Sequence, residues 1–378
     1  MEKDFNPFLL SGYKGPAYFC DREKETAAIR QNILNGINTT LFAIRRVGKT
    51  GLIQHVFNSF SGNNKIACIY VDILSSNNLK DFTNLLATVI YNHFPENKSI
   101  AKKIAQAIKS LRPLISFDTL AGTPELSFEL REARQYEKTI AQLFSFLDNQ
   151  NIKVVFAIDE FQQILEYPEK NTEALLRSHI QSLKNTSFIF CGSNQKMMHE
   201  IFNTAKRPFF ASCSNLHLDF IDYKLYADFI ARMFKKHSVK ITPEAIDFIL
   251  EFTDCHTFYT QYLCNYLFAT NIKTIDLKEV QLIALEVLKL NEPTYFQYRN
   301  LITTAQWNLL QAIAKEYKLY QAHSKTFISK YNLGTSSMIS RGLNSLLDKE
   351  LVYYNSFVQQ PYYQVYDKFM MRWMQHKL

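Results

Sequence analysis

The segment Leu41-Phe-Ala-Ile-Arg-Arg-Val-Gly-Lys-Thr50, followed by Gly51, has the layout of a phosphate-binding loop. Its apolar start predicts a buried strand, a turn follows, and a helix is expected to begin at Lys49. Backbone N–H groups in such a loop, together with the helix N-terminus, bind phosphate. Lys49 is expected to reach the β- and γ-phosphates, and the Thr50 hydroxyl to bind Mg²⁺. The residues predicted to bind nucleotide are Arg45, Arg46, Val47, Gly48, Lys49, Thr50 and Gly51.

The loop departs from the pattern G-x-x-x-x-G-K-[ST] at its first position, where Ala43 replaces glycine. Gly-Lys-Thr alone is short enough to occur by chance. The alternative interpretation is an ordinary turn glycine followed by a surface lysine. The position of the motif, directly after an apolar run and before a helix, favours the phosphate-binding loop.

A second apolar run, Lys153-Val-Val-Phe-Ala-Ile-Asp-Glu160, ends in two adjacent carboxylates. This pattern is typical of a Walker B strand, which is buried on both faces of a parallel sheet and ends beside the ligand. Asp159 is expected to complete the Mg²⁺ shell, and Glu160 to act as a general base on water. The alternative, a strand that ends in a polar turn, is weakened by the Gly-Lys-Thr upstream.

Two further strands end in polar residues. Ser187-Phe-Ile-Phe-Cys-Gly-Ser-Asn194 places Ser193 and Asn194 at a strand end, where they either contact the γ-phosphate region or cap the helix that follows. Asp72 closes the strand predicted to begin at Ile66. It either supports the Mg²⁺ site or caps the next turn, and we favour the cap.

Composition indicates a globular protein: 47% of the 378 residues are hydrophobic and 21% are charged. The six cysteines are scattered without a C-x-x-C pair, which argues against a zinc site and favours a reduced, cytoplasmic setting. The first residues show no signal peptide, and no apolar run is long enough to span a membrane. The net charge of +8 permits a nucleic-acid partner without establishing one.

Three domains are expected along the chain. Asp21 is expected to cap the first helix, residues 98–111 to form a helix, and residues 113–130 to form a β-hairpin insertion before the Walker B strand. From Tyr223 to Leu290 the pattern is helical without strands, and the section from Asn291 predicts three helices followed by a two-stranded wing. The expected domains are a P-loop core with an N-terminal arm (1–221), a helical lid (222–292) and a winged helix (293–378).

With these motifs placed, the chain resembles the archaeal-type ATPase branch of the STAND class of P-loop NTPases, relatives of AAA+ proteins. The resemblance rests on five stretches: Phe19-Cys-Asp-Arg-Glu-Lys-Glu25, Arg45-Arg-Val-Gly-Lys-Thr50, Ala157-Ile-Asp-Glu160, Cys191-Gly-Ser193 and the closing winged helix. It implies an α/β fold with a parallel-sheet core, a helical lid and a winged helix, with ATP or ADP and Mg²⁺ as ligands. It also implies that Arg22 and Glu23 lie by the adenine and that Ser193 or Asn194 senses the γ-phosphate.

The chain departs from that family at two further places. Where the family has Pro-Phe-Tyr-x-Arg, this chain has Pro208-Phe-Phe-Ala-Ser212, so the arginine expected to contact the γ-phosphate is missing, with Arg207 a few residues earlier. Where the family has Gly-His-Pro, this chain has Cys255-His-Thr257. His256 is expected either to touch the β-phosphate or to pack within the lid.

The sequence leads to three functional hypotheses. The first is an ATP-dependent switch with slow hydrolysis, whose lid and winged helix pass the nucleotide state to a protein partner. The second is a winged-helix regulator that binds nucleic acid, with the ATPase site secondary or inactive; we favour the protein partner. The third is an inactive ATPase fold that serves as a scaffold. No membrane partner is expected.

Overall fold

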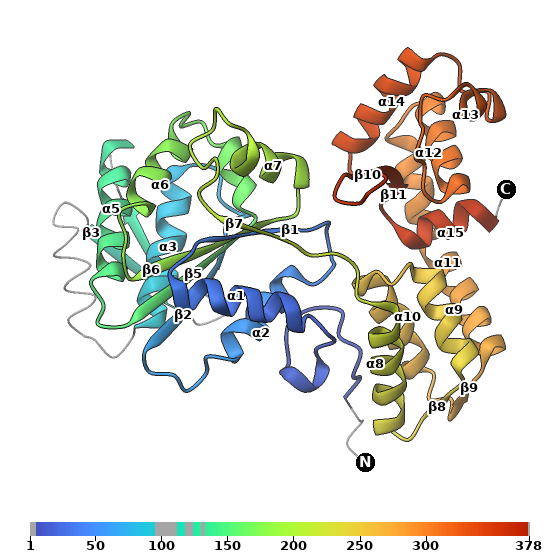
Figure 1. The fold of residues 1–378 in the computed structure, drawn as a ribbon, viewed down its shortest axis with the longest axis horizontal. Helices are drawn as coiled ribbons and strands as arrows, with labels where there is room; N and C mark the ends of the chain where they lie inside the picture. Colours follow the sequence, from blue (N-terminus) through green and yellow to red (C-terminus); the bar gives the residue numbers. More distant parts are fainter. Residues whose placement is uncertain (1–4, 95–111, 118–123, 130–132, 377–378) are drawn as a thin grey trace. The chain divides into compact units, whose positions relative to one another are not determined.

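The computed structural model describes residues 5–94, 112–117, 124–129 and 133–376 (Figure 1). The helix expected over residues 98–111 lies outside the described residues. The chain divides into two compact units, which are described separately below. One comprises Arg22–Asp219, and the other joins Met1–Asp21 to Phe220–Leu378.

A five-stranded parallel sheet with the order β2-β5-β6-β1-β7 forms the centre of the Arg22–Asp219 unit (Figure 1). The fold class expected from the sequence is confirmed. Strand β6 lies between β1, which leads into the phosphate-loop sequence, and β5, which carries the paired carboxylates. The strands are β1 (Thr39–Phe42), β2 (Ile66–Asp72), β5 (Lys153–Asp159), β6 (Thr186–Gly192) and β7 (Ser214–His217).

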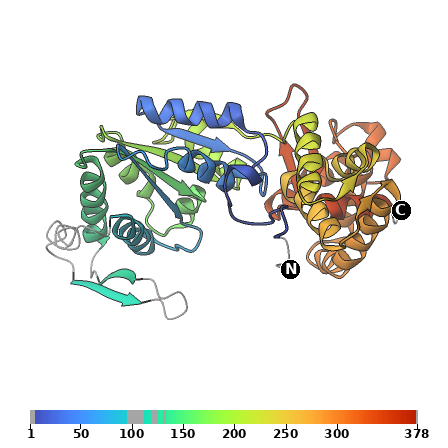
Figure 2. The ribbon, with the colours of Figure 1, turned by 90° about the horizontal axis from the view of Figure 1, so that it is seen from below.

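Helices cover both faces of this sheet, as burial of its central strands on both faces requires. Phe156, Phe188 and Phe190 point to one face and pack beneath a set of amphipathic helices. The helices there are α3 (Leu79–His93), α5 (Ala133–Asp148), α6 (Thr172–Ile180) and α7 (Gln195–Asn203). Helices α1 (Glu23–Asn35) and α2 (Lys49–Asn58) pack on each other over the opposite face; Figure 2 shows α1 and α3 on opposite sides of the strands.

The insertion before β5 forms the expected hairpin, in which β3 (Arg112–Phe117) pairs antiparallel with β4 (Pro124–Glu129). The expected cap of α1 is wrong. Arg22, not Asp21, occupies the N-cap position, and both residues have left-handed backbone angles (φ 72° and 57°). Asp72 accepts a hydrogen bond from the Leu74 N–H (2.8 Å), which agrees with its favoured role as a turn cap.

In the other unit, helices follow one another from Tyr223 as expected, but this region also contains a short strand pair that the sequence did not indicate. Strands β8 (Lys240–Ile241) and β9 (Thr274–Ile275) pair in parallel. The helices are α8 (Tyr223–Lys236), α9 (Pro243–Thr253), α10 (Thr257–Ala269) and α11 (Leu277–Asn300). Helix α11 is ten residues longer than the apolar periodicity indicated and continues through Pro293.

The N-terminal arm, expected to accompany the core, packs in this second unit. The Phe8 ring lies 4.7 Å from that of Phe234. The Asn6 side chain donates to the Asn265 carbonyl, and the Asn265 side chain donates to the Phe8 carbonyl. The next section has the three helices and the two-stranded wing of a winged helix. Its elements are α12 (Thr304–Glu316), α13 (Lys325–Lys330), α14 (Ser336–Asp348), β10 (Val352–Asn355) and β11 (Tyr362–Val365).

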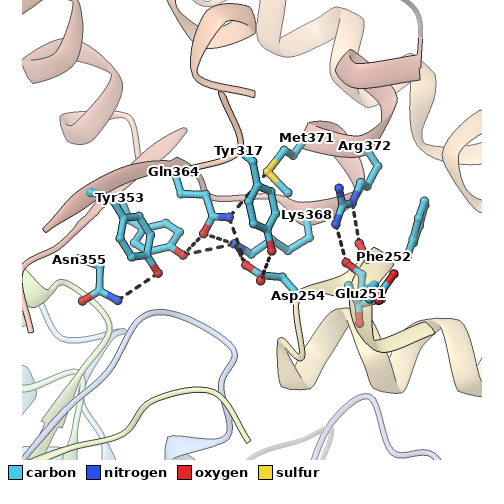
Figure 3. A network of polar contacts seen from close by, with 12 residues as sticks. Glu251, Phe252, Asp254, Tyr317, Tyr353, Asn355, Gln364, Lys368, Met371 and Arg372 are labelled. Carbon is cyan, nitrogen blue, oxygen red and sulfur yellow. Dashed lines mark hydrogen bonds and ion pairs between the residues drawn. The ribbon is translucent and has the colours of Figure 1, made fainter. Parts of the chain in front are cut away.

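A last helix, α15 (Lys368–His376), was not expected, and it fastens the winged helix to the end of α9 (Figure 3). The fully buried Lys368 ammonium lies 3.0 Å from Asp254 Oδ2 and donates to Gln364 Oε1 (2.7 Å). Tyr317 also donates to Asp254, and Arg372 donates to the last carbonyls of α9. These contacts supply side-chain donors to the carbonyl end of α9, where the last carbonyls of a helix have no partner within the helix.

No helix in the described ranges is long and apolar enough to cross a lipid bilayer.

Candidate functional site

The loop between β1 and α2 has the backbone that a phosphate cradle needs. Gly48 adopts φ 99° immediately before α2, a conformation that glycine reaches at little cost. Arg46 is also left-handed (φ 59°), whereas Ala43 is not among the positive-φ residues. The first motif position is fully buried and demands no glycine conformation, so alanine fits there.

Lys49 opens helix α2, and its side chain folds back along the loop. Its ammonium donates to the Ile44 carbonyl (3.2 Å), and the residue is only 7% exposed. Burial lowers the pKa of Lys49, while the neighbouring Cys191, Asp159 and Glu160 act in the opposite direction. A buried cation beside the end of β5 attracts anionic groups such as phosphate.

The Asp159 carboxylate is the centre of the site. Its Oδ2 accepts hydrogen bonds from the hydroxyls of Thr50 and Tyr70, each at 2.8 Å. Its Oδ1 accepts from the Glu160 N–H (2.9 Å) and the Cys191 thiol (3.0 Å). Each oxygen therefore has two protein donors, which fix the carboxylate in one orientation.

These residues meet because of the sheet register. Asp159 pairs with Asp72 of β2, two residues beyond Tyr70, and Cys191 lies on β6 next to the pair Ile158–Phe190. Alternate residues of a strand point to opposite faces. Tyr70, Asp159 and Cys191 share the face covered by α2, which carries Thr50.

Glu160 follows Asp159 with left-handed backbone angles (φ 56°), which turns its side chain toward β6. Its Oε2 accepts from the Ser193 hydroxyl (2.7 Å), the Ser193 N–H (3.2 Å) and the Gln162 amide (2.6 Å). Asn194 instead caps α7 by accepting from the Met197 N–H (3.1 Å). Of the two residues considered at the end of β6, Ser193 faces the carboxylate and Asn194 caps the helix.

Gly192 allows Gln162 to lie across the end of β6. A Cβ at Gly192 would lie 2.0 Å from Gln162 Oε1 and 2.8 Å from Met198 Sδ. Distances this short exclude any side chain unless both Gln162 and Met198 move away. The glycine therefore leaves the space in which the amide reaches Glu160.

Arg22 is only 4% exposed, and its guanidinium contacts two backbone carbonyls and one carboxylate of the same unit. Its Nη2 lies 2.6 Å from the Asp219 carbonyl and 3.5 Å from the Val47 carbonyl of the loop, and its Nη1 pairs with Glu25 (3.1 Å). Glu23, the other residue expected near the adenine, is exposed in the first turn of α1. Arg45 and Arg46 are exposed in the loop, and Gly51 follows within α2.

Two other expected residues have contacts of their own. The Arg207 guanidinium forms ion pairs with Glu173 (3.3 Å) and Glu200 (3.2 Å). His256 belongs to the other unit, where it is buried beside α10 and its ring centroid lies 5.5 Å from that of Phe220 and 4.8 Å from that of Tyr259. Its contact with a phosphate stays a prediction.

The donor set fits Mg²⁺ held together with a nucleotide. A threonine hydroxyl beside a carboxylate supplies oxygen ligands, which Mg²⁺ prefers, and Mg²⁺ usually takes few protein ligands and completes its shell with phosphates and water. Within the described ranges, no cluster of three or more His, Cys, Asp or Glu side chains could hold a metal by itself. The buried ammonium of Lys49 beside that carboxylate matches the anionic part of such a ligand.

The sequence did not identify three side chains of this site, namely Tyr70, Gln162 and Cys191. Tyr70 and Asp72 are two residues apart on one strand, so strand alternation places their side chains on the same face and could have indicated Tyr70. It could not show which face of β2 lies toward α2. Gln162 is brought to Glu160 by the left-handed turn, for which the sequence offered no signal.

Comparisons with solved structures support the fold. The Walker-type ATPase PABY2304 of Pyrococcus abyssi is similar with a TM-score of 0.66 and 17% identity, over 98% of this chain and 99% of that chain. The ORC2 protein of Aeropyrum pernix, in its ADPNP–ADP complexes, is similar with a TM-score of 0.55 and 14% identity, over 99% and 98% of the two chains. No curated protein sequence matches this chain.

Two family models match the sequence. One, described as "Probable winged helix domain", covers residues 293–376 and coincides with the helices and the wing described above. The other, described as "ATPase domain predominantly from Archaea", covers residues 19–257 and contains the whole phosphate loop and the Asp159 site. Since this second match spans more than half of the sequence, the chain belongs to the family of ATPase domains found predominantly in Archaea.

Proposed function

We propose that the chain binds ATP or ADP with Mg²⁺ at the loop between β1 and α2 and hydrolyses ATP slowly, as a molecular switch. One observation carries this proposal: the Thr50 hydroxyl, at the start of α2, donates to Asp159 at the end of β5 (2.8 Å). These residues are far apart in sequence, and the parallel sheet brings them to one edge. Ligands of open α/β sheets bind at that edge.

Each residue at this edge has a proposed task. Lys49 would bind the β- and γ-phosphates, and Thr50 and Asp159 would hold Mg²⁺. When bound, Mg²⁺ would neutralise charge on the phosphate oxygens. Glu160 would orient the attacking water and accept its proton, with Ser193 holding the carboxylate in place.

The Arg207 ion pairs support slow hydrolysis. Because its guanidinium is paired with Glu173 and Glu200, it is held by carboxylates instead of being available to transition-state charge. Phosphoryl transfer without an arginine loses a large part of its electrostatic stabilisation, worth about 10³–10⁵ in rate in GTPases. We propose that a partner or a second copy of the chain supplies the missing charge.

The relay to a partner would pass through the helical lid (222–292) and the winged helix (293–378). Helix α11 continues across this boundary without a break, and α15 ties the winged helix to α9. A rigid pair of domains transmits a hinge movement better than a flexible one. Membership of the STAND class, suggested by the paired arginines Arg45 and Arg46 and the winged helix, belongs to the same proposal.

The test is a nucleotide assay on the purified full-length chain. Nucleotide released by denaturation is identified, and Mg²⁺-dependent ATP turnover is measured for the wild type, Lys49→Ala and Glu160→Gln. Glu166→Gln makes the same chemical change at an exposed carboxylate six residues further on and serves as the matched control. Lys49→Ala is expected to abolish binding, whereas Glu160→Gln is expected to retain ATP without turnover.

Turnover at the wild-type rate in both Lys49→Ala and Glu160→Gln would overturn the site assignment. Absence of nucleotide binding at millimolar ATP would favour the inactive scaffold.

A second candidate function is nucleic-acid binding by the winged helix. The exposed face of α14 presents Ser337, Arg341 and Asn344, whose donors can read base edges in a major groove, although Asp348 lies on the same face. Binding of duplex DNA that weakens with salt and is lost in Arg341→Ala would support this function. No binding at low salt would exclude it and leave the protein partner.

A further inference from the structure

We propose that Tyr70 is a positioning residue for the Mg²⁺ ligands, which holds Asp159 and Thr50 in the arrangement that binds the ion. This inference rests on the proposed nucleotide site and goes beyond the loop and the strand-end carboxylates, whose motifs do not include a residue of β2. Tyr70 lies two residues before the end of that strand, and its hydroxyl reaches Asp159 on the face toward α2.

The geometry joins three side chains from three elements. The hydroxyls of Tyr70 on β2 and Thr50 on α2 both donate to the same oxygen of Asp159, each at 2.8 Å. The other oxygen of Asp159 is held by Glu160 and Cys191. Of these four donors, only the Tyr70 hydroxyl comes from a strand outside the recognised motifs.

Tyr70 can act only as a donor toward Asp159. A phenol keeps its proton at neutral pH and a carboxylate oxygen accepts, so the Tyr70 hydroxyl is the donor of the 2.8 Å bond to Asp159. A neutral phenol that donates a hydrogen bond to a carboxylate restricts the rotation of that carboxylate. The carboxylate remains the group that binds the metal. Partners of this kind, outside the ligands themselves, orient the ligands of a metal.

The same arrangement leaves Thr50 suited to its proposed task. Because the Thr50 hydroxyl gives its one proton to Asp159, both of its lone pairs remain for a cation. If Asp159 rotated, Thr50 would lose this acceptor and its hydroxyl would be free to turn. Tyr70 therefore stabilises Thr50 indirectly, through the shared carboxylate oxygen.

The test compares ADP affinity with Mg²⁺ and with EDTA, each measured by titration calorimetry on the same protein. The variants are Tyr70→Phe, which removes only the hydroxyl, and Tyr167→Phe as the matched control. Tyr167 is a buried tyrosine of the same unit whose hydroxyl bonds to Ser76, away from Asp159. The quantity compared is the ADP affinity in Mg²⁺ divided by the ADP affinity in EDTA. A general loss of stability lowers both affinities and leaves this ratio unchanged.

We expect Tyr70→Phe to leave the affinity in EDTA unchanged and to weaken the affinity in Mg²⁺ about 10-fold, since loss of an outer partner of a metal ligand costs roughly 10–100-fold in metal affinity. Tyr167→Phe is expected to keep the wild-type ratio. Replacement Tyr70→4-aminophenylalanine, which retains a donor of similar reach, is expected to restore most of the ratio and provides a second variant where Tyr70→Phe folds poorly.

An unchanged or larger ratio in Tyr70→Phe would overturn the role of Tyr70 while leaving the nucleotide site intact. An equal loss in Tyr70→Phe and Tyr167→Phe would overturn it too, because the effect would then be general. A wild-type chain that binds ADP in neither condition would overturn the proposed function itself, so the two failures are distinguishable.

Discussion

The Lys368 ammonium lies 3.0 Å from Asp254 Oδ2, and this ion pair joins the last helix of the chain to the end of α9 (Figure 3). Lys368 is fully buried, and Gln364 and Tyr353 accept its remaining hydrogen bonds. Asp254 has left-handed backbone angles and stands two residues before His256. The pair therefore fixes the turn that leads into α10.

Removing one partner of this pair is expected to destabilise the second unit strongly. Lys368→Met leaves the Asp254 charge buried and unpaired, which should lower the free energy of unfolding by about 3–5 kcal/mol. Urea unfolding measures the change. The double variant Lys368→Met/Asp254→Asn should recover part of the loss, since it removes the unpaired charge.

The control for this prediction is Lys330→Met. Lys330 also pairs with a carboxylate, that of Glu316 at 2.7 Å, but its side chain is 58% exposed. Exposed pairs contribute little, so this variant should change stability far less than Lys368→Met. Equal losses from the two variants would contradict a special role for the buried pair.

Stability should also depend on alkaline pH through Lys368. Burial lowers the pKa of Lys368 from 10.5 to about 8, although Asp254 acts in the opposite direction. Between these values the unfolded chain binds more protons than the folded chain, so this group makes the free energy of unfolding rise with pH. Below about pH 8 its contribution is constant, because both states are protonated.

The measurement is the difference in unfolding free energy between the wild type and Lys368→Met, determined by urea titration at several pH values. The unfolding free energy of the wild type should increase relative to that of Lys368→Met as the pH rises from about 8 to 10.5, by at most about 3 kcal/mol. A difference that stays flat, or moves in favour of Lys368→Met, would show that Lys368 remains charged throughout.

Arg22 is predicted to stabilise the loop and not to select the base. Arg22→Met removes the donor to the Asp219 carbonyl and to the buried Val47 carbonyl, and loss of the donor to a buried group costs about 1–3 kcal/mol. The affinities for ATP and for tripolyphosphate should therefore fall by the same factor. A loss of affinity confined to ATP would instead support contact between Arg22 and the adenine. The control is Arg30→Met, because the Arg30 guanidinium donates to the Ser59 carbonyl, outside the loop.

Gly192→Ala is expected to disturb Glu160 through Gln162. The added methyl would lie 2.0 Å from Gln162 Oε1 and must push the amide aside, with a loss of about 1–3 kcal/mol as in other overpacked sites. Thermal unfolding and ATP turnover measure the two effects. The double variant Gly192→Ala/Gln162→Ala should regain part of the stability, since Met198 Sδ still lies 2.8 Å from the added methyl, without regaining turnover. A Gly192→Ala variant as stable and active as the wild type would contradict the argument.

Much of the fold could be predicted because its signals are local. The apolar runs ending at Phe42, Asp159 and Gly192 correspond to central strands, and the hairpin and the winged helix appeared where turn residues and periodicity placed them. The N-cap of α1 and the strand pair of Lys240–Ile241 with Thr274–Ile275 were missed. A left-handed Arg22 and two-residue strands have no periodic signal, and they form because tertiary contacts stabilise them.

The sequence by itself determined a parallel α/β core with a phosphate loop, and it identified Lys49, Thr50, Asp159 and Glu160. It could do so because an apolar strand and the polar motif that follows it are formed by neighbouring residues of the chain. Only the tertiary structure decided that Tyr70 and Cys191 hold Asp159, that Ser193 and not Asn194 faces Glu160, and that Lys368 meets Asp254. These contacts depend on strand register and helix packing, which join residues that no local pattern relates.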